Sequence, residues 1–339
     1  MASLRSDYVP WYTQLHLTKV ALVIFVTALP VTANGTALPV TANVTALPVT
    51  ANATALPVTA NKMDTKLNQA GCGKLGSKGR IYNGKPTFME NMPWIVQITS
   101  IFYVAPGGQF SCGGSIITRN LILTAAHCLF HKGVFAQMVM VFYSSDLFMT
   151  GKTLLAEKMI LHPKFVNKFV LQHDVALLKL AVDLQFSRQA KPVCLPTAKM
   201  DLAGKTLVVA GWGATESANN SKILLRAEVV ALTDDECQAS LRRLINPLTR
   251  RPMRPGPAVC ASGLNQRACK GDSGGPLTLT NDDGRTLQVG IVSAGVPCPS
   301  KIASVYASVA SHIRWIRRAL NRPRKWIKLR HTRKVVNMG

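Results

Sequence analysis

The chain has 339 residues, of which 47% are hydrophobic and 17% charged, and its formal net charge is +24 at pH 7. Its length suffices for one long all-β domain with extensions or for two ordinary domains. Its eight cysteines include no C-x-x-C pair, which excludes the common zinc and redox motifs and predicts disulfides, hence an oxidising compartment.

Residues 1–33 are typical of a secretory signal. Arg5 and Lys19 precede an apolar run at 20–26, which continues weakly to residue 33 and is too short to span a bilayer. The small residues 31–33 provide a cleavage site, so we expect a secreted, extracellular protein. Because the leading part is long for a signal, an upstream start codon or a retained anchor stays open.

A nine-residue repeat, Thr-Ala-Leu-Pro-Val-Thr-Ala-Asn-x, occurs four times between residues 27 and 62. Proline in every repeat prevents regular helix and long strand, which predicts an extended, flexible spacer. Asn34, Asn43 and Asn52 in the repeats, and Asn219 further on, are followed two residues later by Thr or Ser and are expected glycosylation sites. A repeat expansion without function explains the spacer equally well.

Beyond residue 81, short apolar or alternating runs are separated by Gly, Pro and Asn, which predicts an all-β protein. From residue 302 the spacing becomes helical, through 312–316. The clearest apolar runs are 94–98, 121–123, 139–142, 207–210 and 287–292.

Three motifs carry candidate chemistry. His127 lies in Thr-Ala-Ala-His-Cys, Asp174 begins Asp-Val-Ala-Leu-Leu, and Ser273 lies in Gly-Asp-Ser-Gly-Gly-Pro. A serine hydroxyl becomes a strong nucleophile when a base removes its proton and a third group orients that base. The glycines around Ser273 allow a tight turn and close approach to a substrate carbonyl. A buried structural histidine is the alternative for His127 alone, and the other two motifs argue against it.

The order His, Asp, Ser resembles the trypsin/chymotrypsin-type serine endopeptidases over roughly residues 72–320. In α/β-hydrolases, which share Gly-x-Ser-x-Gly, the serine comes first. Further matches are Gly113-Gly114-Ser115, Gly211-Trp212-Gly213 and Ile291-Val292-Ser293. The resemblance implies two six-stranded antiparallel β-barrels, a C-terminal helix and an active site between the barrels, with the protease domain at 81–320.

The resemblance also implies a role for each site residue. Ser273 would attack the scissile carbonyl, His127 would act as base and then as acid, and Asp174 would orient the imidazole. Ser293 would hydrogen-bond the aspartate, and the backbone N–H groups of Gly271 and Ser273 would form the oxyanion hole.

Zymogen activation is implied at Arg80-Ile81. Cleavage after Arg80 would cut the chain between the repeat-containing pro-segment, residues 34–80, and the protease domain, and would free the amino group of Ile81. That group would pair with the carboxylate of Asp272 and shape the oxyanion hole and the pocket. An ordinary exposed arginine is the alternative for Arg80.

The resemblance pairs all eight cysteines. A further family disulfide is missing, and Leu207 and Leu279 occupy its positions. The implied pairs are Cys72–Cys194, Cys112–Cys128, Cys237–Cys260 and Cys269–Cys298.

The substrate pocket departs from the trypsin pattern. Arg267 stands where trypsin-like members carry the aspartate that selects basic side chains, and Lys270 adds a second positive charge. We therefore predict cleavage after Asp or Glu, which Arg267 would bind bidentately. Arg267 folded across the cavity or pointing to solvent is the alternative, and Ala294 replaces a tryptophan that packs on the substrate backbone. The expected pocket residues are Arg267, Lys270, Ser293, Gly295 and Ser304.

We expect no metal and no cofactor. Asp146 is the only acidic residue between Phe130 and Lys152, where some relatives bind calcium through an acidic cluster.

The positive charge is concentrated near the C-terminus, where residues 321–339 form a basic tail. Ten of the charges lie between Arg314 and Lys334, with no acidic residue among them. Such a field favours polyanions or an anionic membrane surface, and a solvated tail without a partner is the alternative. The other expected partners are protein substrates and an activating protease, with no nucleic acid, and we expect a monomer. Five further arginines, in a proline-rich loop, are Arg242, Arg243, Arg250, Arg251 and Arg254.

The sequence is therefore compatible with two functions. The leading one is a secreted serine endopeptidase made as a zymogen. The alternative is a non-catalytic protease homologue that binds polyanions or regulates other proteases, and Arg267 and Ala294 keep it open.

Overall fold

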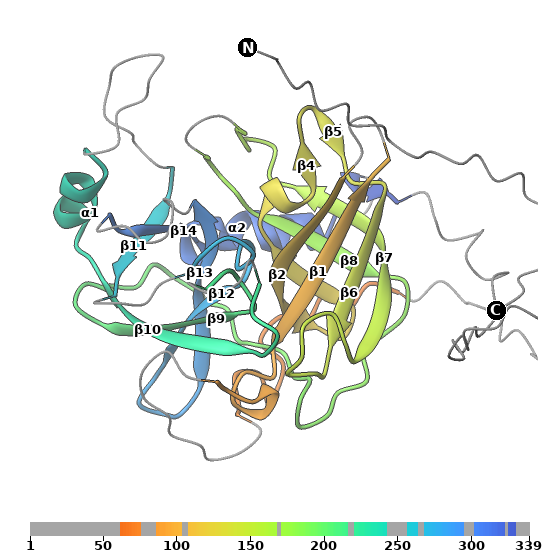
Figure 1. The fold of residues 1–339 in the computed structure, drawn as a ribbon, viewed down its shortest axis with the longest axis horizontal. Coiled ribbons are helices and arrows are strands. Elements are labelled where there is room, and N and C mark those ends of the chain that lie inside the picture. The colour runs from red at the N-terminus through yellow and green to blue at the C-terminus, as the bar shows by residue number, and fades with distance from the viewer. Residues whose placement is uncertain are drawn as a thin grey trace, which may run out of the picture. The chain divides into compact units, whose positions relative to one another are not determined.

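The computed structural model describes residues 62–75, 86–103, 108–167, 171–215, 220–242, 256–263, 268–294, 302–322 and 325–329 (Figure 1). Several predicted features lie outside these residues. They are the signal-like segment, nearly all of the repeats, Arg80, Ile81, Asn34, Asn43, Asn52, Asn219, Arg267, Gly295 and Cys298.

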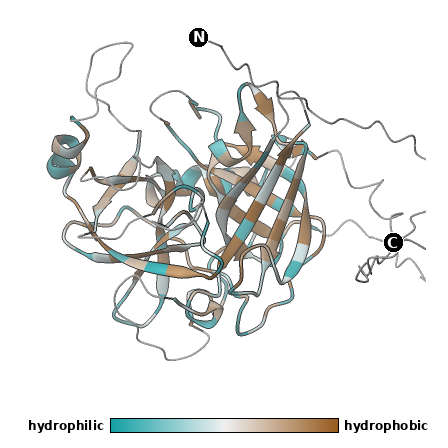
Figure 2. Ribbon diagram, viewed as in Figure 1, coloured by the Kyte–Doolittle hydropathy of each residue, from teal (hydrophilic) through white to brown (hydrophobic). Residues whose placement is uncertain are grey.

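The first barrel is a closed antiparallel sheet in the order β7-β6-β1-β2-β3-β8, in which β7 also pairs with β8. Strands such as β6 alternate buried and half-buried residues, as expected where one face of a sheet covers a core. Figure 2 shows hydrophobic residues running along these strands. The strands are β1 (Ile95–Phe102), β2 (Gly108–Thr118), β3 (Leu121–Thr124), β6 (Met138–Tyr143), β7 (Lys152–Leu161) and β8 (Ala176–Leu180).

Short elements flank this barrel. The 3-10 helix η1 (Met89–Asn91) precedes β1, and η2 (Ala126–Cys128) follows β3 directly. A two-stranded hairpin, β4 (Phe130–His131) and β5 (Val134–Phe135), follows η2.

The second barrel closes in the order β10-β11-β14-β13-β12-β9. Leu207, fully buried, and Leu279, half-buried, belong to the same hydrophobic cluster, so apolar packing stands where the family disulfide is missing. Helix α1 (Asp234–Leu241) begins with a capping box between Thr233 and Glu236. The strands are β9 (Thr206–Gly211), β10 (Leu225–Ala231), β11 (Ala258–Ser262), β12 (Pro276–Thr280), β13 (Thr286–Ala294) and β14 (Ser304–Ser308).

Helix α2 (Val309–Leu320) follows β14 and packs its apolar face into the core of the first barrel. It thereby links the two barrels. The predicted fold, two six-stranded antiparallel barrels with a C-terminal helix, is confirmed. No helix in the described part of the chain is both long and apolar enough to cross a membrane.

Beyond α2, part of the basic C-terminal segment packs on the first barrel. Strand β15 (Ile327–Lys328) pairs antiparallel with β7, and Leu329 donates its N–H to the carbonyl of Glu157 at 2.9 Å. Trp326 is buried, and its indole N–H donates to the carbonyl of Ala319 at 3.1 Å. The segment thus extends the sheet of the first barrel by one strand.

The Trp326→Ala variant is expected to lose about 3 kcal/mol of unfolding free energy, because it removes a large buried side chain and leaves a cavity. Urea unfolding followed by tryptophan fluorescence and circular dichroism measures this loss. A Lys328→Ala variant is the control, since Lys328 is exposed on the same strand. Equal stability of the Trp326→Ala variant and the wild type would contradict the packing.

Three of the expected disulfides are present: Cys72–Cys194, Cys112–Cys128 and Cys237–Cys260. The first ties residues 62–75 to the protease body, where Asn68 and the backbone of Leu195 also exchange two hydrogen bonds of 2.8 Å. The expected bond Cys269–Cys298 stays a prediction because Cys298 lies outside the described residues.

Candidate active site

The three motif residues come from both barrels. His127 lies in η2 and Asp174 lies two residues before β8, so the first barrel carries both. Ser273 lies in the turn before β12 of the second barrel. The carbonyl of Ser273 accepts the N–H of Gly113 on β2 at 2.7 Å, which holds the two barrels together at this point.

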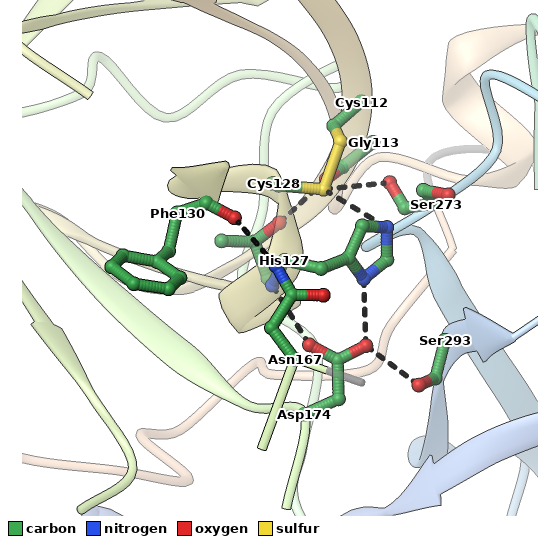
Figure 3. Close-up of polar contacts among 10 residues, drawn as sticks. Cys112, Gly113, His127, Cys128, Phe130, Asn167, Asp174, Ser273 and Ser293 are labelled. Carbon is green, nitrogen blue, oxygen red and sulfur yellow. Dashed lines mark hydrogen bonds and ion pairs between the residues drawn. A yellow bond between two sulfur atoms is a disulfide. The ribbon is translucent and has the colours of Figure 1, made fainter. Parts of the chain in front are cut away.

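The carboxylate of Asp174 is hydrogen-bonded from three sides and is 1% exposed (Figure 3). Its Oδ2 lies 2.7 Å from Nδ1 of His127 and accepts the hydroxyl of Ser293 on β13 at 2.6 Å. Its Oδ1 accepts the backbone N–H of His127 at 2.9 Å. The two oxygens therefore hold both the backbone and the ring of the histidine.

This environment shifts the ionisation of both groups. Burial opposes the charged form of His127, but the negative charge of Asp174 and its hydrogen bond outweigh burial and raise the pKa of the imidazole. Burial likewise opposes the charged form of Asp174, but His127 and the hydroxyl of Ser293 together lower the pKa of the carboxyl. The arrangement therefore favours a carboxylate beside an imidazole that can take up a proton.

The Cys112–Cys128 disulfide lies close to both His127 and Ser273. Sγ of Cys128 is 3.9 Å from Nε2 of His127 and 3.6 Å from the backbone oxygen of Ser273. Figure 3 shows the imidazole between Asp174 and Ser273, with Nδ1 towards the carboxylate. The remaining nitrogen, Nε2, is thus available on the side of the serine.

The turn that carries Ser273 requires glycine on both sides. Gly271 has φ of +101° and Gly274 has φ of +80°, a region that residues with a Cβ rarely adopt. Any Cβ at Gly274 would also collide with Thr124 and with the carbonyl of Gly113. Thr124, the first residue of the motif around His127, donates its hydroxyl to that carbonyl at 2.8 Å, a role that the motif alone did not indicate.

Asp272, beside Ser273, is buried, and its carboxylate is turned away from that serine. Its carboxylate oxygens accept the N–H groups of Gly213 and Cys269, each at 2.8 Å. Burial raises the pKa of Asp272 to about 6, although both hydrogen bonds favour the charged form. No ion pair joins it to any cation among the residues that the structure describes.

The expected pocket residues are described only in part. Lys270 is exposed beside the Ser273 turn, and its carbonyl accepts the N–H of Ala214 at 2.6 Å. Ser304 is buried on β14, and Ser293 is hydrogen-bonded to Asp174. Asp146 has a structural role, because its carboxylate accepts the N–H of Met89 at 2.6 Å at the start of η1.

Comparison with known proteins gives one family. The family model named Trypsin matches residues 81–316. Ovochymase-2 of Mus musculus is 31% identical over 226 residues, which are 65% of this chain and 35% of that protein, so the chain spans about a third of its length. The β subunit of clotting factor G of Tachypleus tridentatus is 30% identical over 74% of this chain and 82% of its own length.

A solved collagenase structure has the same fold. It is 26% identical in sequence, with a TM-score of 0.59, and the match covers 71% of this chain and 99% of the collagenase. Residues 81–316, which match the Trypsin family model, contain both barrels and all three motif residues. The chain therefore belongs to the trypsin family.

Proposed function

We propose that the chain is the precursor of a secreted serine endopeptidase that cleaves proteins with Ser273, His127 and Asp174. The observation that carries this proposal is the 2.7 Å contact between Nδ1 of His127 and a buried carboxylate, which leaves Nε2 on the side of the serine. An orienting acid, a base and a nucleophile in this order are the requirements of acyl transfer.

In the proposed reaction the Oγ–C bond of an acyl-enzyme forms first, the peptide C–N bond then breaks, and water finally cleaves the Oγ–C bond. Oγ of Ser273 attacks the scissile carbonyl while Nε2 of His127 takes its proton, and Asp174 stabilises the imidazolium. The N–H groups of Gly271 and Ser273 bind the oxyanion. His127 then gives the proton to the leaving amine, and water, activated by the same base, hydrolyses the acyl-enzyme.

Activation would follow cleavage after Arg80. The new amino group of Ile81 would enter the second barrel and pair with Asp272. Two observations support this: the carboxylate of Asp272 is buried, and among the described residues no cation forms an ion pair with it. A buried carboxylate gains most from an incoming charge when hydrogen bonds already hold it in place.

Labelling with an organophosphate probe tests this function and distinguishes it from a non-catalytic homologue. The full-length protein, cleaved after Arg80, should form one covalent adduct at Ser273, seen by peptide mass spectrometry. Uncleaved protein is the control and should react much more slowly. No adduct after confirmed cleavage would favour the non-catalytic homologue.

The activity is expected to rise with pH through a pKa above 6.5, the ordinary value for histidine, because His127 must be neutral to accept the serine proton and Asp174 raises its pKa. The kcat/KM of the cleaved enzyme between pH 5 and 9 measures this limb. In the Asp174→Asn variant the limb should move to lower pH, since the charge that favours imidazolium is gone. An unchanged midpoint would show that Asp174 does not control the titration.

The substrate preference is proposed to be Asp or Glu before the cleaved bond, because by the family resemblance Arg267 and Lys270 would supply positive charge at the pocket. A peptide library should show faster cleavage after Asp and Glu than after Lys. The Arg267→Asp variant should reverse that order, because the new carboxylate repels acidic and attracts basic side chains. Faster cleavage after Lys by the wild type would overturn the preference.

Export, glycosylation of the repeats and binding to polyanions complete the proposal. Disulfides support an oxidising compartment. The exposed basic residues around α2 and β15 support a polyanion surface, and salt-dependent retention on heparin tests it. These residues are Arg314, Arg317, Arg318, Arg322, Lys325 and Lys328.

A further inference from the structure

Three histidines from distant parts of the sequence form a cluster next to Asp174. His162 follows the end of β7, His173 precedes Asp174, and His312 lies in the first turns of α2. One ring nitrogen from each lies within 4.8 Å of the other two. The rings of His162 and His173 stack with centroids 4.6 Å apart, and the ring of His312 stands almost perpendicular to both.

The hydrogen bonds of His312 define which of its nitrogens is free. Its Nδ1 lies 2.6 Å from the backbone carbonyl of Ser308, which can only accept, so Nδ1 carries the proton. Its Nε2 therefore presents a lone pair, and Nδ1 of His173 lies 3.1 Å from it. Metal-binding histidines are typically held in this way, with the second ring nitrogen donating to a carbonyl.

The spacing fits a metal as well as a direct hydrogen bond. Two imidazole nitrogens on one tetrahedral zinc ion lie about 3.3 Å apart, given Zn–N bonds of about 2.0–2.1 Å. The nitrogens of His173 and His312 are 3.1 Å apart. Binding would transfer the Nδ1 proton of His173 to its own Nε2 and would place the ion between the two rings.

His162 would supply the third ligand less readily. Its Nδ1 accepts the N–H of Lys164 at 3.2 Å, and this local hydrogen bond must be given up before either ring nitrogen can bind an ion. We therefore expect His162 to contribute less affinity than His173 or His312. A water molecule would complete four-coordination.

The electrostatics around the cluster are mixed. Lys164 opposes a cation, whereas the carboxylate of Asp174 favours one, since it acts on His312 as a nearby negative charge. Burial is the largest cause that lowers the pKa of His312 and of His162, the latter to about 4, so burial favours the neutral form of both rings. Neutral imidazole is the form that binds metals.

We propose that His162, His173 and His312 form a binding site for a zinc-class divalent transition metal, and that its occupancy slows the reaction at Ser273. Imidazole ligands favour zinc, copper or nickel over calcium and magnesium. The other cluster of potential ligands within the described residues, Cys112, Cys128 and His127, offers no thiolate because its cysteines form a disulfide. The sequence analysis predicted no metal because the segment between Phe130 and Lys152 lacks an acidic cluster.

The effect on catalysis follows from the position of His173. Because His173 directly precedes Asp174 in the chain, a shift of its backbone moves the aspartate. The φ of His173 is +50°. Asp174 must keep its 2.7 Å contact with Nδ1 of His127. The effect on rate rests on the proposed function, whereas the metal site itself does not.

Metal binding is tested first, without reference to activity. Isothermal titration of the full chain as the Ser273→Ala variant with zinc chloride should give one site per chain, and cobalt should give the visible absorption of a tetrahedral ion. His312→Phe and His173→Phe, added to that background, should weaken zinc binding at least tenfold, and His162→Phe less. His131→Phe is the matched control, since this histidine packs on Phe110 outside the cluster.

Near-ultraviolet circular dichroism shows whether each variant is folded, and His162→Phe, at the edge of the cluster, keeps the test possible if His312→Phe does not fold. Two results would overturn the site. One is that the folded Ser273→Ala parent binds no stoichiometric zinc, and the other is that all three cluster variants bind zinc as tightly as this parent does.

The coupling is tested by organophosphate labelling of the cleaved wild type with zinc and with a chelator. Zinc should slow labelling at least threefold, and His312→Phe should abolish that slowing. If zinc slows His312→Phe as much as wild type, the ion acts elsewhere, for instance on His127, and the coupling is wrong. Binding without any change in labelling would also refute the coupling. A protein that binds zinc but is never labelled would contradict the proposed function and leave the site standing.

Discussion

The Ser273→Ala variant is expected to lose about 10⁶-fold in kcat, because it removes the proposed nucleophile, without which His127 and Asp174 have no proton to transfer. The change deletes one oxygen from a half-exposed side chain, so the melting temperature should stay within about 2 °C of wild type. Peptide hydrolysis after cleavage at Arg80, with matched circular dichroism, measures both quantities.

Asp174→Asn is the companion variant and should lose about 10⁴-fold, the loss typical when the orienting carboxylate of a serine protease is removed. It keeps the size of the side chain but cannot accept the Nδ1–H of His127 and the hydroxyl of Ser293 in the same way. Because the two residues act as a unit, the double variant should be no slower than Ser273→Ala alone. Additive losses would show that the residues act independently.

The Asp272→Asn variant of the chain cleaved after Arg80 is expected to lose about 10²–10³-fold in kcat. Asp272 lies between the two oxyanion donors, Gly271 and Ser273, and losing one such donor typically has this effect. The neutral amide cannot pair with the amino group of Ile81. Active-site titration and kcat of cleaved wild type and variant measure the loss, and equal rates would contradict the role of the ion pair.

The pH dependence of the unfolding free energy gives an independent measure of the proposed ion pair between Asp272 and the amino group of Ile81. In the uncleaved chain the pKa of Asp272 is raised from 3.8 to about 6, so between these values the folded state binds more protons than the unfolded state. The free energy of unfolding should therefore fall by up to about 3 kcal/mol as the pH rises through this window. After cleavage the positive charge of Ile81 should lower this pKa and remove the fall.

Urea unfolding at pH 4.5 and pH 7, before and after cleavage, measures whether the free energy of unfolding falls as the pH rises. Asp272→Asn is the control without a titrating group, and its uncleaved form should lack this contribution. Retention of the fall in the Asp272→Asn variant would assign it to other groups.

The family and the chemistry of its motifs were readable in the sequence because each motif is local. Histidine, aspartate and serine in that order, with glycines around the serine, carry the family resemblance that implied two barrels, and this fold is confirmed. Glycine was required at 271 and 274 for a reason that acts within a few bonds, the positive φ of the turn. The strand runs were likewise visible as short apolar stretches.

Contacts between distant segments had no such signal. His162, His173 and His312 share no motif spacing, and they meet because α2 packs its apolar face on the first barrel. The basic C-terminal segment gave no indication that Trp326 is buried and that β15 extends a sheet. Residue type and spacing thus specify turns, strands and reactive groups. The contacts between distant segments depend instead on how a whole barrel packs, which no single stretch of sequence encodes.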